Sequence, residues 1–518
     1  MSRNMRAFGA GAVGAILAFG LAELAHGIYD LVPSVFLAIA QGIIELTPGG
    51  FATQAIETLG SADIPVLITS TVVGSLVVAG LLGILSLRSR LAALLGVAGL
   101  GAIALVAAFT EPFIAPIPLI LTIVTALGLG AWFADYLIRT SDLRTEEPAK
   151  KAAPTQTAPA NEASREAPAM NVRYKEAHSH RGIAVPRKNF LAMGGAAAVV
   201  GLAAAGTGRA LSGGAAGEVP AAGPIKVGSK GGAVLHETLP PPPAAASIEV
   251  PGMPPLMTPN EDFYLIDTVL SSPRINVERW KLSVKGAVEN PISFTYKDLL
   301  DMPTRESDVT LSCVSNEVGG GLVSNARWTG VLLSDVLKEA GVRRENIGRA
   351  SEQLIGRSAD GWTGGFKTDL ALDGRDALVA FGMNGSELPL KHGYPVRLVV
   401  PGIYGYVSAT KWLTEIELTN WDFDAYWIQR TWTKEGPVKT QSRIDTVKDG
   451  DSLEAGRIPV GGVAWAPHKG IDKVEVSTDD GETWNEARLA AQLDPDTWRQ
   501  FVYDWDASGA SGEHTIKV

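Results

Sequence analysis

Four apolar stretches lie in the first 140 residues, and each is long enough to cross the hydrocarbon core of a membrane. They are Ala7–Gly27, Ile64–Leu87, Leu91–Thr110 and Ala115–Ile138. A helix needs about 20 apolar residues to span a bilayer. A fifth, shorter stretch covers Phe190–Gly206. A cleaved signal peptide explains one such segment but not five, so the pattern predicts a multi-span membrane anchor.

The basic residues between these stretches predict how the chain is oriented. Arg3 and Arg6 precede the first stretch, Arg88 and Arg90 join the second to the third, and ten Lys or Arg lie in residues 139–188. The loop that follows the first stretch has none. Cytoplasmic loops retain Lys and Arg because these residues resist translocation. We therefore expect a multi-pass plasma-membrane protein with a cytoplasmic N-terminus and an extracytoplasmic region beyond about residue 207.

Two features near the first stretch leave alternatives open. The run Leu31–Leu46 contains Pro33, Gln41 and Glu45, so we expect an interfacial or re-entrant segment; a full crossing would reverse the orientation. Glu23 predicts either a proton or quinol pathway or a contact between helices, since carboxylates are costly inside a membrane.

Two linkers flank the fifth stretch. Residues 141–186, rich in Ala, Pro, Thr, Glu and Lys, predict a disordered cytoplasmic linker. The run Pro186-Arg187-Lys188-Asn189-Phe190-Leu191 resembles a twin-arginine export signal, and the alternative is an ordinary stop-transfer flank. Residues 187–207 then form the fifth span. Residues 208–256 contain four consecutive prolines and predict a second linker, stiffened by polyproline II geometry.

Charge and cysteine content exclude several classes of protein. The chain has 518 residues and a net charge of −10, which argues against a nucleic-acid partner. Its only cysteine, Cys313, excludes an intramolecular disulfide, a CxxC pair, a thiolate-held iron–sulfur cluster and covalent c-type haem. His26 is the only histidine in or next to a span, so a haem held by two helix histidines lacks its ligands. A redox function would therefore need a separate electron carrier or a quinone.

From residue 257 the composition changes to that of a water-soluble domain. Short strands and helices follow one another without a regular βαβ alternation, which predicts an α+β domain over residues 257–430. The expected strands are Trp280–Val284, Val309–Ser312, Val396–Val400 and Lys411–Leu418, and the expected helices are Tyr296–Leu300 and Val331–Ala340.

Residues 436–518 show a different pattern of short strands and turns. The expected strands are Ile458–Trp465, Ile471–Ser477, Trp484–Leu489, Trp498–Trp505 and His514–Val518. The turn Asp479-Asp480-Gly481 suits a hairpin. We predict an immunoglobulin-like β-sandwich, and because the sequence ends within its last strand, we expect the sandwich to be incomplete.

The segment with the most chemical information surrounds Cys313. The cysteine ends an expected strand and precedes a turn containing three consecutive glycines, Gly319–Gly321. A glycine-rich turn lets a bulky ligand approach the thiolate, and a soft thiolate suits a transition metal. A buried cysteine acting as a small hydrophobic residue is the structural alternative. A cysteine hydrolase using His392 is a third, but no Asn or Asp motif orients that histidine.

Four sequence blocks in order resemble the sulfite oxidase family of molybdenum-cofactor (molybdopterin) enzymes, in its bacterial membrane-attached branch. They are Cys313 with Asn316, the run Ala326–Val331, the segment Met383–Pro389, and the run His392–Gly402 with its continuation to Leu413. The resemblance covers roughly residues 255–518 and none of the membrane region.

The resemblance implies a role for nine residues. Cys313 is the thiolate ligand of molybdenum, and the pair Cys313 and Asn316 forms the motif around it. His392, Arg397 and Lys411 are expected to hold the pterin phosphate and pyran edge, as charged donors suit a phosphate. The remaining expected contacts are Ser408 and Tyr264 to the cofactor, and Asp360 and Tyr404 in the catalytic pocket.

Two departures from the family bear on the substrate. Sulfite-oxidising members carry Phe-x-x-Arg-Asn-His where this chain has Phe263–Thr268, and an arginine before the Lys-Trp pair where it has Tyr406–Ser408. An oxyanion needs fixed cations around it. We therefore expect a two-electron oxygen-atom transfer with a neutral small-molecule donor or acceptor, such as a sulfoxide or N-oxide, rather than with sulfite. The alternative is a degenerate, non-catalytic binding or assembly module. The C-terminal sandwich resembles the family's dimerisation domain, which implies a homodimer.

Overall fold

The computed structural model describes residues 2–29, 32–47, 58, 63–110, 114–142, 187–214, 235–270 and 272–518. They fall into two units, a helical unit within residues 1–215 and a second unit from residue 216 onward, each described here by itself. Most of the expected cytoplasmic linker, Pro186 of the export motif and residues 215–234 of the second linker lie outside the described residues.

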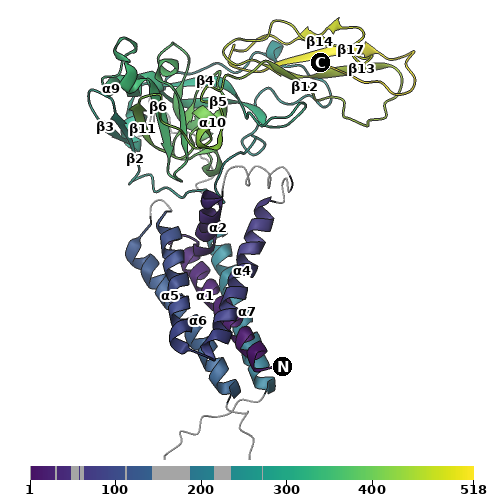
Figure 1. The fold of residues 1–518 in the computed structure, drawn as a ribbon. Coiled ribbons are helices and arrows are strands. Elements are labelled where there is room, and N and C mark those ends of the chain that lie inside the picture. Colours follow the sequence, from purple (N-terminus) through teal and green to yellow (C-terminus); the bar gives the residue numbers. More distant parts are fainter. Residues whose placement is uncertain are drawn as a thin grey trace, which may run out of the picture. The chain divides into compact units, whose positions relative to one another are not determined.

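The helical unit contains six described helices (Figure 1). They are α1 (Arg3–Ile28), α2 (Val35–Leu46), α4 (Asp63–Ser86), α5 (Arg90–Phe109), α6 (Pro116–Asp142) and α7 (Arg187–Gly214). By length and composition α1, α4, α5, α6 and α7 are candidates to cross a membrane, and they coincide with the five apolar stretches of the sequence. The 12-residue helix α2 is shorter than a span.

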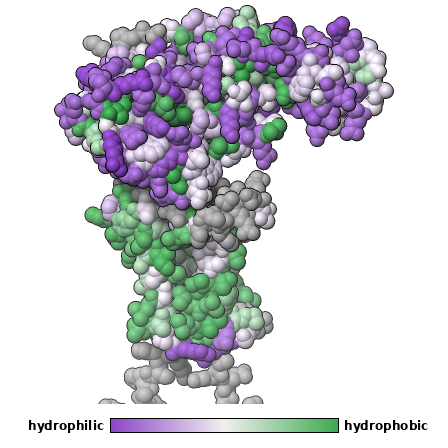
Figure 2. Space-filling view, turned by 45° about the horizontal axis from the view of Figure 1, so that its top comes forward, coloured by the Kyte–Doolittle hydropathy of each residue, from purple (hydrophilic) through white to green (hydrophobic). Residues whose placement is uncertain are grey.

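Helix α1 packs against α4, α6 and α7 through its glycines. A Cβ atom at Gly20 would collide with the backbone of Gly201 in α7, and one at Gly14 with the backbone of Gly130 in α6. Small residues allow such close backbone contact between membrane helices. The outward surface of this unit is largely hydrophobic, as Figure 2 shows.

Glu23 is buried in this bundle and has a polar partner. The Ser34 hydroxyl at the start of α2 donates a hydrogen bond of 2.5 Å to its carboxylate, and His26 Nδ1 donates to the Val32 carbonyl at 2.7 Å. Of the two interpretations of Glu23, these bonds favour the contact between helices.

The second unit begins with two facing sheets (Figure 1). The first has strand order β1-β4-β5-β8-β10, with β9 beside β8, and the second has order β3-β2-β11-β6-β7. The strands of the first are β1 (Leu235–Glu237), β4 (Thr304–Ser312), β5 (Val323–Leu332), β8 (Leu378–Met383), β9 (Ser386–Glu387) and β10 (Arg397–Val399). Those of the second are β2 (Lys281–Gly286), β3 (Ile292–Thr295), β6 (Gln353–Ser358), β7 (Thr363–Lys367) and β11 (Leu413–Thr419).

The main hydrophobic core joins the two sheets. Leu282 and Ile416 of the second sheet, Val379 of the first and Leu337 of α9 belong to one buried cluster. A second buried cluster contains Val309, Leu311 and Trp328, on the other face of the first sheet. The α-helices of this region are short: α8 (Tyr296–Asp301), α9 (Leu333–Glu339) and α10 (Gly405–Ser408). Mixed sheets with short helices confirm the α+β class.

Several expected element boundaries differ from the structure, among them those of Val309–Ser312, Ile471–Ser477 and Trp484–Leu489. Two further differences have a clear local reason. The helix expected from Val331 starts at Leu333, because Val331 and Leu332 continue β5 and pair with β8. The strand expected from Lys411 starts at Leu413, because Trp412 has a φ of 49°, which is incompatible with an extended strand.

The C-terminal region has one sheet of order β12-β13-β17-β16 and a two-stranded sheet of β14 and β15. Their bounds are β12 (Gln441–Ile444), β13 (Arg457–Trp465), β14 (Glu475–Val476), β15 (Asn485–Glu486), β16 (Arg488–Leu489) and β17 (Arg499–Asp506). The expected strand at His514–Val518 is reduced to an isolated bridge between Ser477 and Lys517. The immunoglobulin-like assignment and the domain boundaries stay predictions.

Candidate functional site

Cys313 follows the last residue of β4 and opens a tight loop that closes at Leu322. The Cys313 N–H donates to the Leu322 carbonyl at 2.9 Å, and the Asn316 N–H donates to the Cys313 carbonyl at 3.1 Å. The Asn316 side-chain oxygen accepts from the Leu322 N–H at 2.7 Å. Asn316 therefore closes the loop, and the half-exposed thiol lies at its base.

Tyr264 connects Cys313 to a buried cation. Burial raises the pKa of the Tyr264 phenol, nearby Cys313 adds to this rise, and Arg397 opposes it. The Tyr264 ring stacks on Phe263 at 5.4 Å between centroids, and Phe263 in turn contacts His392 edge-on at 5.5 Å. The phenol is thus protonated at neutral pH and lies near both the thiol and the guanidinium.

Arg397 is a buried guanidinium on β10, only 4% exposed. Its Nη1 donates to the His392 carbonyl at 3.1 Å, and its charge lies over the Trp328 ring at 5.0 Å. Among the described residues, no carboxylate lies within ion-pair distance of it. Burial lowers the pKa of Arg397 to about 10. A buried cation held by carbonyls and an aromatic face is poised for an anionic ligand.

His392 lies beside this cation in its neutral form. Its Nε2 lies 2.8 Å from the Asn260 carbonyl, so Nε2 carries the proton. Burial, reinforced by the charges of Arg397 and Lys411, lowers the pKa of His392 to about 4. The imidazole therefore keeps an unprotonated Nδ1 as an acceptor at neutral pH.

Lys411 is paired with a carboxylate that the sequence analysis did not identify. Its Nζ donates to Asp267 at 2.7 Å and to the Lys391 carbonyl at 3.1 Å. Burial lowers the pKa of Lys411, opposed by Asp267. Burial also raises the pKa of Asp360, and the nearby Asp267 adds to that rise. The only signal for Asp267 in the sequence was its place in the run Phe263–Thr268, which departs from the family.

Ser408 and Tyr404 use their hydroxyl groups elsewhere. The Ser408 hydroxyl donates to the Tyr404 carbonyl at 3.0 Å within its own turn. The Tyr404 hydroxyl accepts from the Gln441 side chain of β12 at 3.0 Å, and its ring belongs to a core cluster with Trp465. A hydrogen bond and ring contacts thus join Arg397, His392 and the Phe263–Tyr264 pair, and electrostatic interactions relate Cys313 to Tyr264 and Asp360 to Lys411. Ser408 and Tyr404 face other partners.

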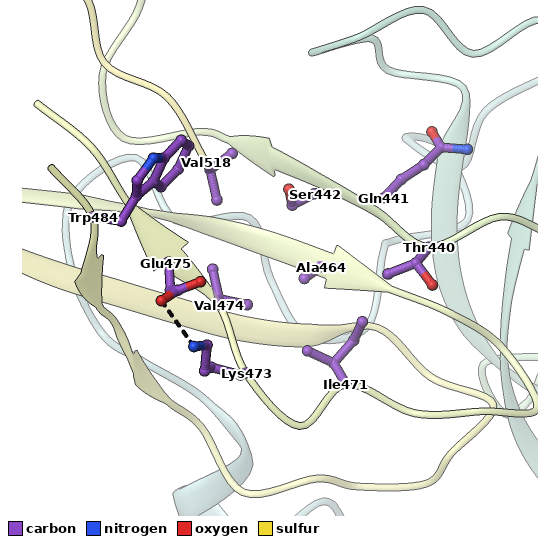
Figure 3. A pocket seen from close by; sticks show the side chains of 10 residues that line it. All are labelled: Thr440, Gln441, Ser442, Ala464, Ile471, Lys473, Val474, Glu475, Trp484 and Val518. Atoms are coloured by element: carbon purple, nitrogen blue, oxygen red, sulfur yellow. Dashed lines mark ion pairs between the residues drawn. The ribbon is translucent and has the colours of Figure 1, made fainter. Parts of the chain in front are cut away.

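A separate open pocket of about 360 Å³ lies in the C-terminal region (Figure 3). Trp484, Ile471 and Val518 line it, together with the ion pair of Lys473 and Glu475 at 2.8 Å. None of the predicted site residues lines this pocket.

Comparison with known proteins defines the class of the second unit. Residues 269–427 match the family described as "Oxidoreductase molybdopterin binding domain". The chain is 32% identical over 273 residues to mitochondrial sulfite oxidase of Rattus norvegicus, covering 46% of this chain and 50% of the relative. It is 27% identical over 281 residues to nitrate reductase [NADH] 1 of Arabidopsis thaliana, covering 44% of this chain and 30% of the relative.

Among solved structures, the sulfane dehydrogenase SoxCD from Paracoccus pantotrophus aligns with a TM-score of 0.43 at 25% identity, covering 51% of this chain and 72% of that chain. The family match over residues 269–427 shows that the second unit contains a molybdopterin-binding oxidoreductase domain. Over about half of its length the chain is similar to sulfite oxidases. It spans about half the length of the rat relative, and these relatives are named for different substrates.

The residues at the site fit the molybdenum cofactor. The half-exposed thiol of Cys313 is a soft ligand, and the unpaired guanidinium of Arg397 suits a phosphate. The neutral His392 adds an acceptor beside them. Molybdopterin is thus the cofactor that the family and these donors imply.

Proposed function

We propose that this chain is a membrane-anchored molybdenum-cofactor oxidoreductase that transfers an oxygen atom to or from a neutral substrate outside the cytoplasm. The observation that carries the proposal is the combination of the half-exposed Cys313 thiol in its tight loop with a buried Arg397 that has no carboxylate partner among the described residues. Without the Arg397 cation, the environment of Cys313 would be equally typical of a structural cysteine.

Each residue then has a distinct part. Cys313 binds the metal, Arg397 and Lys411 hold the anionic end of the pterin, and His392 accepts a hydrogen bond at Nδ1. Tyr264 keeps its proton on the phenolic oxygen beside Cys313, since its pKa is raised. When bound, the cofactor supplies a metal that changes by two electrons as an oxygen atom is transferred.

The proposed substrate class rests on the side chains around this centre. Leu265 and Ile266 follow Tyr264 and are 44% and 50% exposed. Val314 and Val318 lie in the Cys313 loop and are likewise exposed. Exposed apolar side chains next to Tyr264 and Cys313 in the sequence favour a substrate without charge, whereas sulfite needs cations. A sulfoxide or an N-oxide carries no net charge and has an oxygen atom to transfer.

Ile266→Arg is expected to increase kcat/KM for sulfite by about tenfold, equivalent to ~1.4 kcal/mol, mainly through KM. The residue is half exposed, so a guanidinium fits there without burial. The wild-type chain should reduce dimethyl sulfoxide or trimethylamine N-oxide with a viologen donor and oxidise sulfite poorly.

Leu453→Arg is the matched control for that experiment. Leu453 is 49% exposed in the C-terminal region and receives the same new charge far along the chain from the Cys313 loop. Its sulfite kinetics should equal those of the wild type. Efficient sulfite oxidation by the wild type, or equal gains in both variants, would contradict the neutral-substrate proposal.

Anchoring and orientation are supported by the five candidate spans and by their charges. Asp135 near the end of α6 pairs with Arg139 at 2.6 Å and lies 3.6 Å from Arg90 at the start of α5. Basic residues therefore gather at one end of both helices, the end that we place in the cytoplasm. Electrons would reach the metal from a separate carrier or a quinone, and a homodimer stays a proposal from the C-terminal resemblance.

Single cysteines test this orientation in a Cys313→Ser background, where no other thiol remains. Leu453→Cys should react with a membrane-impermeant maleimide in intact cells. Ser89→Cys, in the exposed link between α4 and α5, should react only after permeabilisation. The reverse pattern would place the molybdopterin domain in the cytoplasm.

A further inference from the structure

The C-terminal region contacts the Cys313 segment at two separate points, and the first is on β4. Thr310 lies three residues before Cys313 and is 2% exposed. Its N–H donates to the Asp496 carbonyl at 2.9 Å, and its hydroxyl accepts from the Trp498 N–H at 2.7 Å. The Trp498 indole donates to the Leu256 carbonyl at 2.8 Å, which fixes the tryptophan in turn. The strand that ends on the cysteine is therefore bonded to the C-terminal region.

The second point is on the glycine-rich loop itself. Arg443 of β12 donates from Nη1 to the Gly320 carbonyl at 2.8 Å. Its Nε donates to Asp445 at 2.8 Å, and the side chains of this pair are only 12% and 10% exposed. The ion pair with Asp445 thus fixes the orientation of the Arg443 guanidinium that donates to the Gly320 carbonyl.

The other hydrogen bonds described for the loop, those that Cys313, Asn316 and Gly320 make with Leu322, Cys313 and Glu317, are internal to it. Its exposed residues include Glu317, Val318 and Gly319, and Val318 is fully exposed. A Cβ atom at Gly320 would lie 2.9 Å from the Asn316 oxygen, so the turn is tight at the position that Arg443 contacts. A hydrogen bond from a charged donor contributes about 1.5–3 kcal/mol. Losing it would raise the population of an open loop by about 10- to 100-fold, at 1.4 kcal/mol per factor of ten.

We propose that Arg443 is a positioning residue for Cys313, so that the C-terminal region forms part of the support of the thiolate. Arg443 acts through the Gly320 carbonyl, while Thr310 fixes the strand that precedes the cysteine. The inference rests on the proposed function only in taking Cys313 as the metal ligand.

The test measures how fast iodoacetamide alkylates the only thiol of the full-length chain in detergent, in protein prepared without molybdenum. Arg443→Met should increase the alkylation rate of Cys313 by about tenfold or more. Arg443→Lys, which retains a cationic donor, should restore most of the protection. Loaded with cofactor, the Met variant should show an altered Mo(V) electron paramagnetic resonance signal.

Arg499→Met is the matched control. Arg499 of β17 donates to the Ala490 carbonyl at 2.7 Å and to the Ile471 carbonyl at 2.7 Å, both within the C-terminal region. In this variant the alkylation rate of Cys313 should stay within about twofold of the wild-type rate. Equal rates in all variants, or the same increase in Arg499→Met, would overturn the positioning role. Absence of molybdenum in the wild type would defeat the proposed function and leave the alkylation result valid.

Discussion

Cys313→Ser is expected to lower turnover by more than about 100-fold, beyond the effect typical of losing a residue that merely supports a metal ligand. A serine hydroxyl is a harder donor and stays protonated at neutral pH, so it replaces a thiolate poorly on a soft metal. The loop bonds at this position involve the backbone of Cys313, Leu322 and Asn316, and the substitution leaves them intact. The thermal midpoint should therefore remain close to that of the wild type.

Ser315→Ala, in the exposed part of the same loop, is the control for this variant. It changes a hydroxyl two residues away and leaves the thiol in place, so its turnover should match that of the wild type. Full activity in Cys313→Ser would show that the thiol is a structural residue.

Arg397→Met is expected to lower the amount of bound cofactor without lowering the stability of the fold. Burial of the unpaired guanidinium lowers its pKa to about 10, a penalty on the order of 3 kcal/mol for the folded state. The loss of the His392 carbonyl bond and the Trp328 contact offsets part of this gain, each by about 1 kcal/mol. The cofactor-free variant should thus be no less stable than the wild type, yet it should retain at least tenfold less pterin (~1.4 kcal/mol).

Arg327→Met provides the contrast. Arg327 pairs with Asp308 at 2.8 Å, and the side chain of Asp308 is 3% exposed. Removing the arginine leaves a buried carboxylate without its partner, which typically destabilises a fold by about 3–5 kcal/mol. Thermal unfolding measures the stability of each variant, and pterin fluorescence after denaturation measures how much cofactor it retains. If Arg397→Met unfolds as readily as Arg327→Met, the guanidinium supports the fold rather than the cofactor.

The sequence was sufficient to predict the five candidate spans, because they have a local signal, and the roles of the residues around Cys313 stay predictions. Span length is read directly from composition, and His392, Arg397 and Lys411 lie in continuous blocks that resemble a known family. The pairing of Lys411 with Asp267 had no such signal, because 144 residues separate the two side chains along the chain.

Side-chain direction was the other limit of prediction. Tyr404 and Ser408 lie close in sequence to the expected site, but the turn α10 directs their hydroxyl groups to β12 and to its own backbone. The start of α9 was misplaced because β5 extends to pair with β8, and strand pairing outweighs the helical spacing of its last residues.

The most direct test of the account is the molybdenum content of the detergent-purified wild-type chain and of Cys313→Ser, measured by elemental mass spectrometry after production in a host that makes the cofactor. We expect about one molybdenum per wild-type chain, because the site offers one thiolate, and a reduced amount in the variant. A wild-type chain without molybdenum would contradict it, and a non-catalytic binding or assembly module would then be the better description.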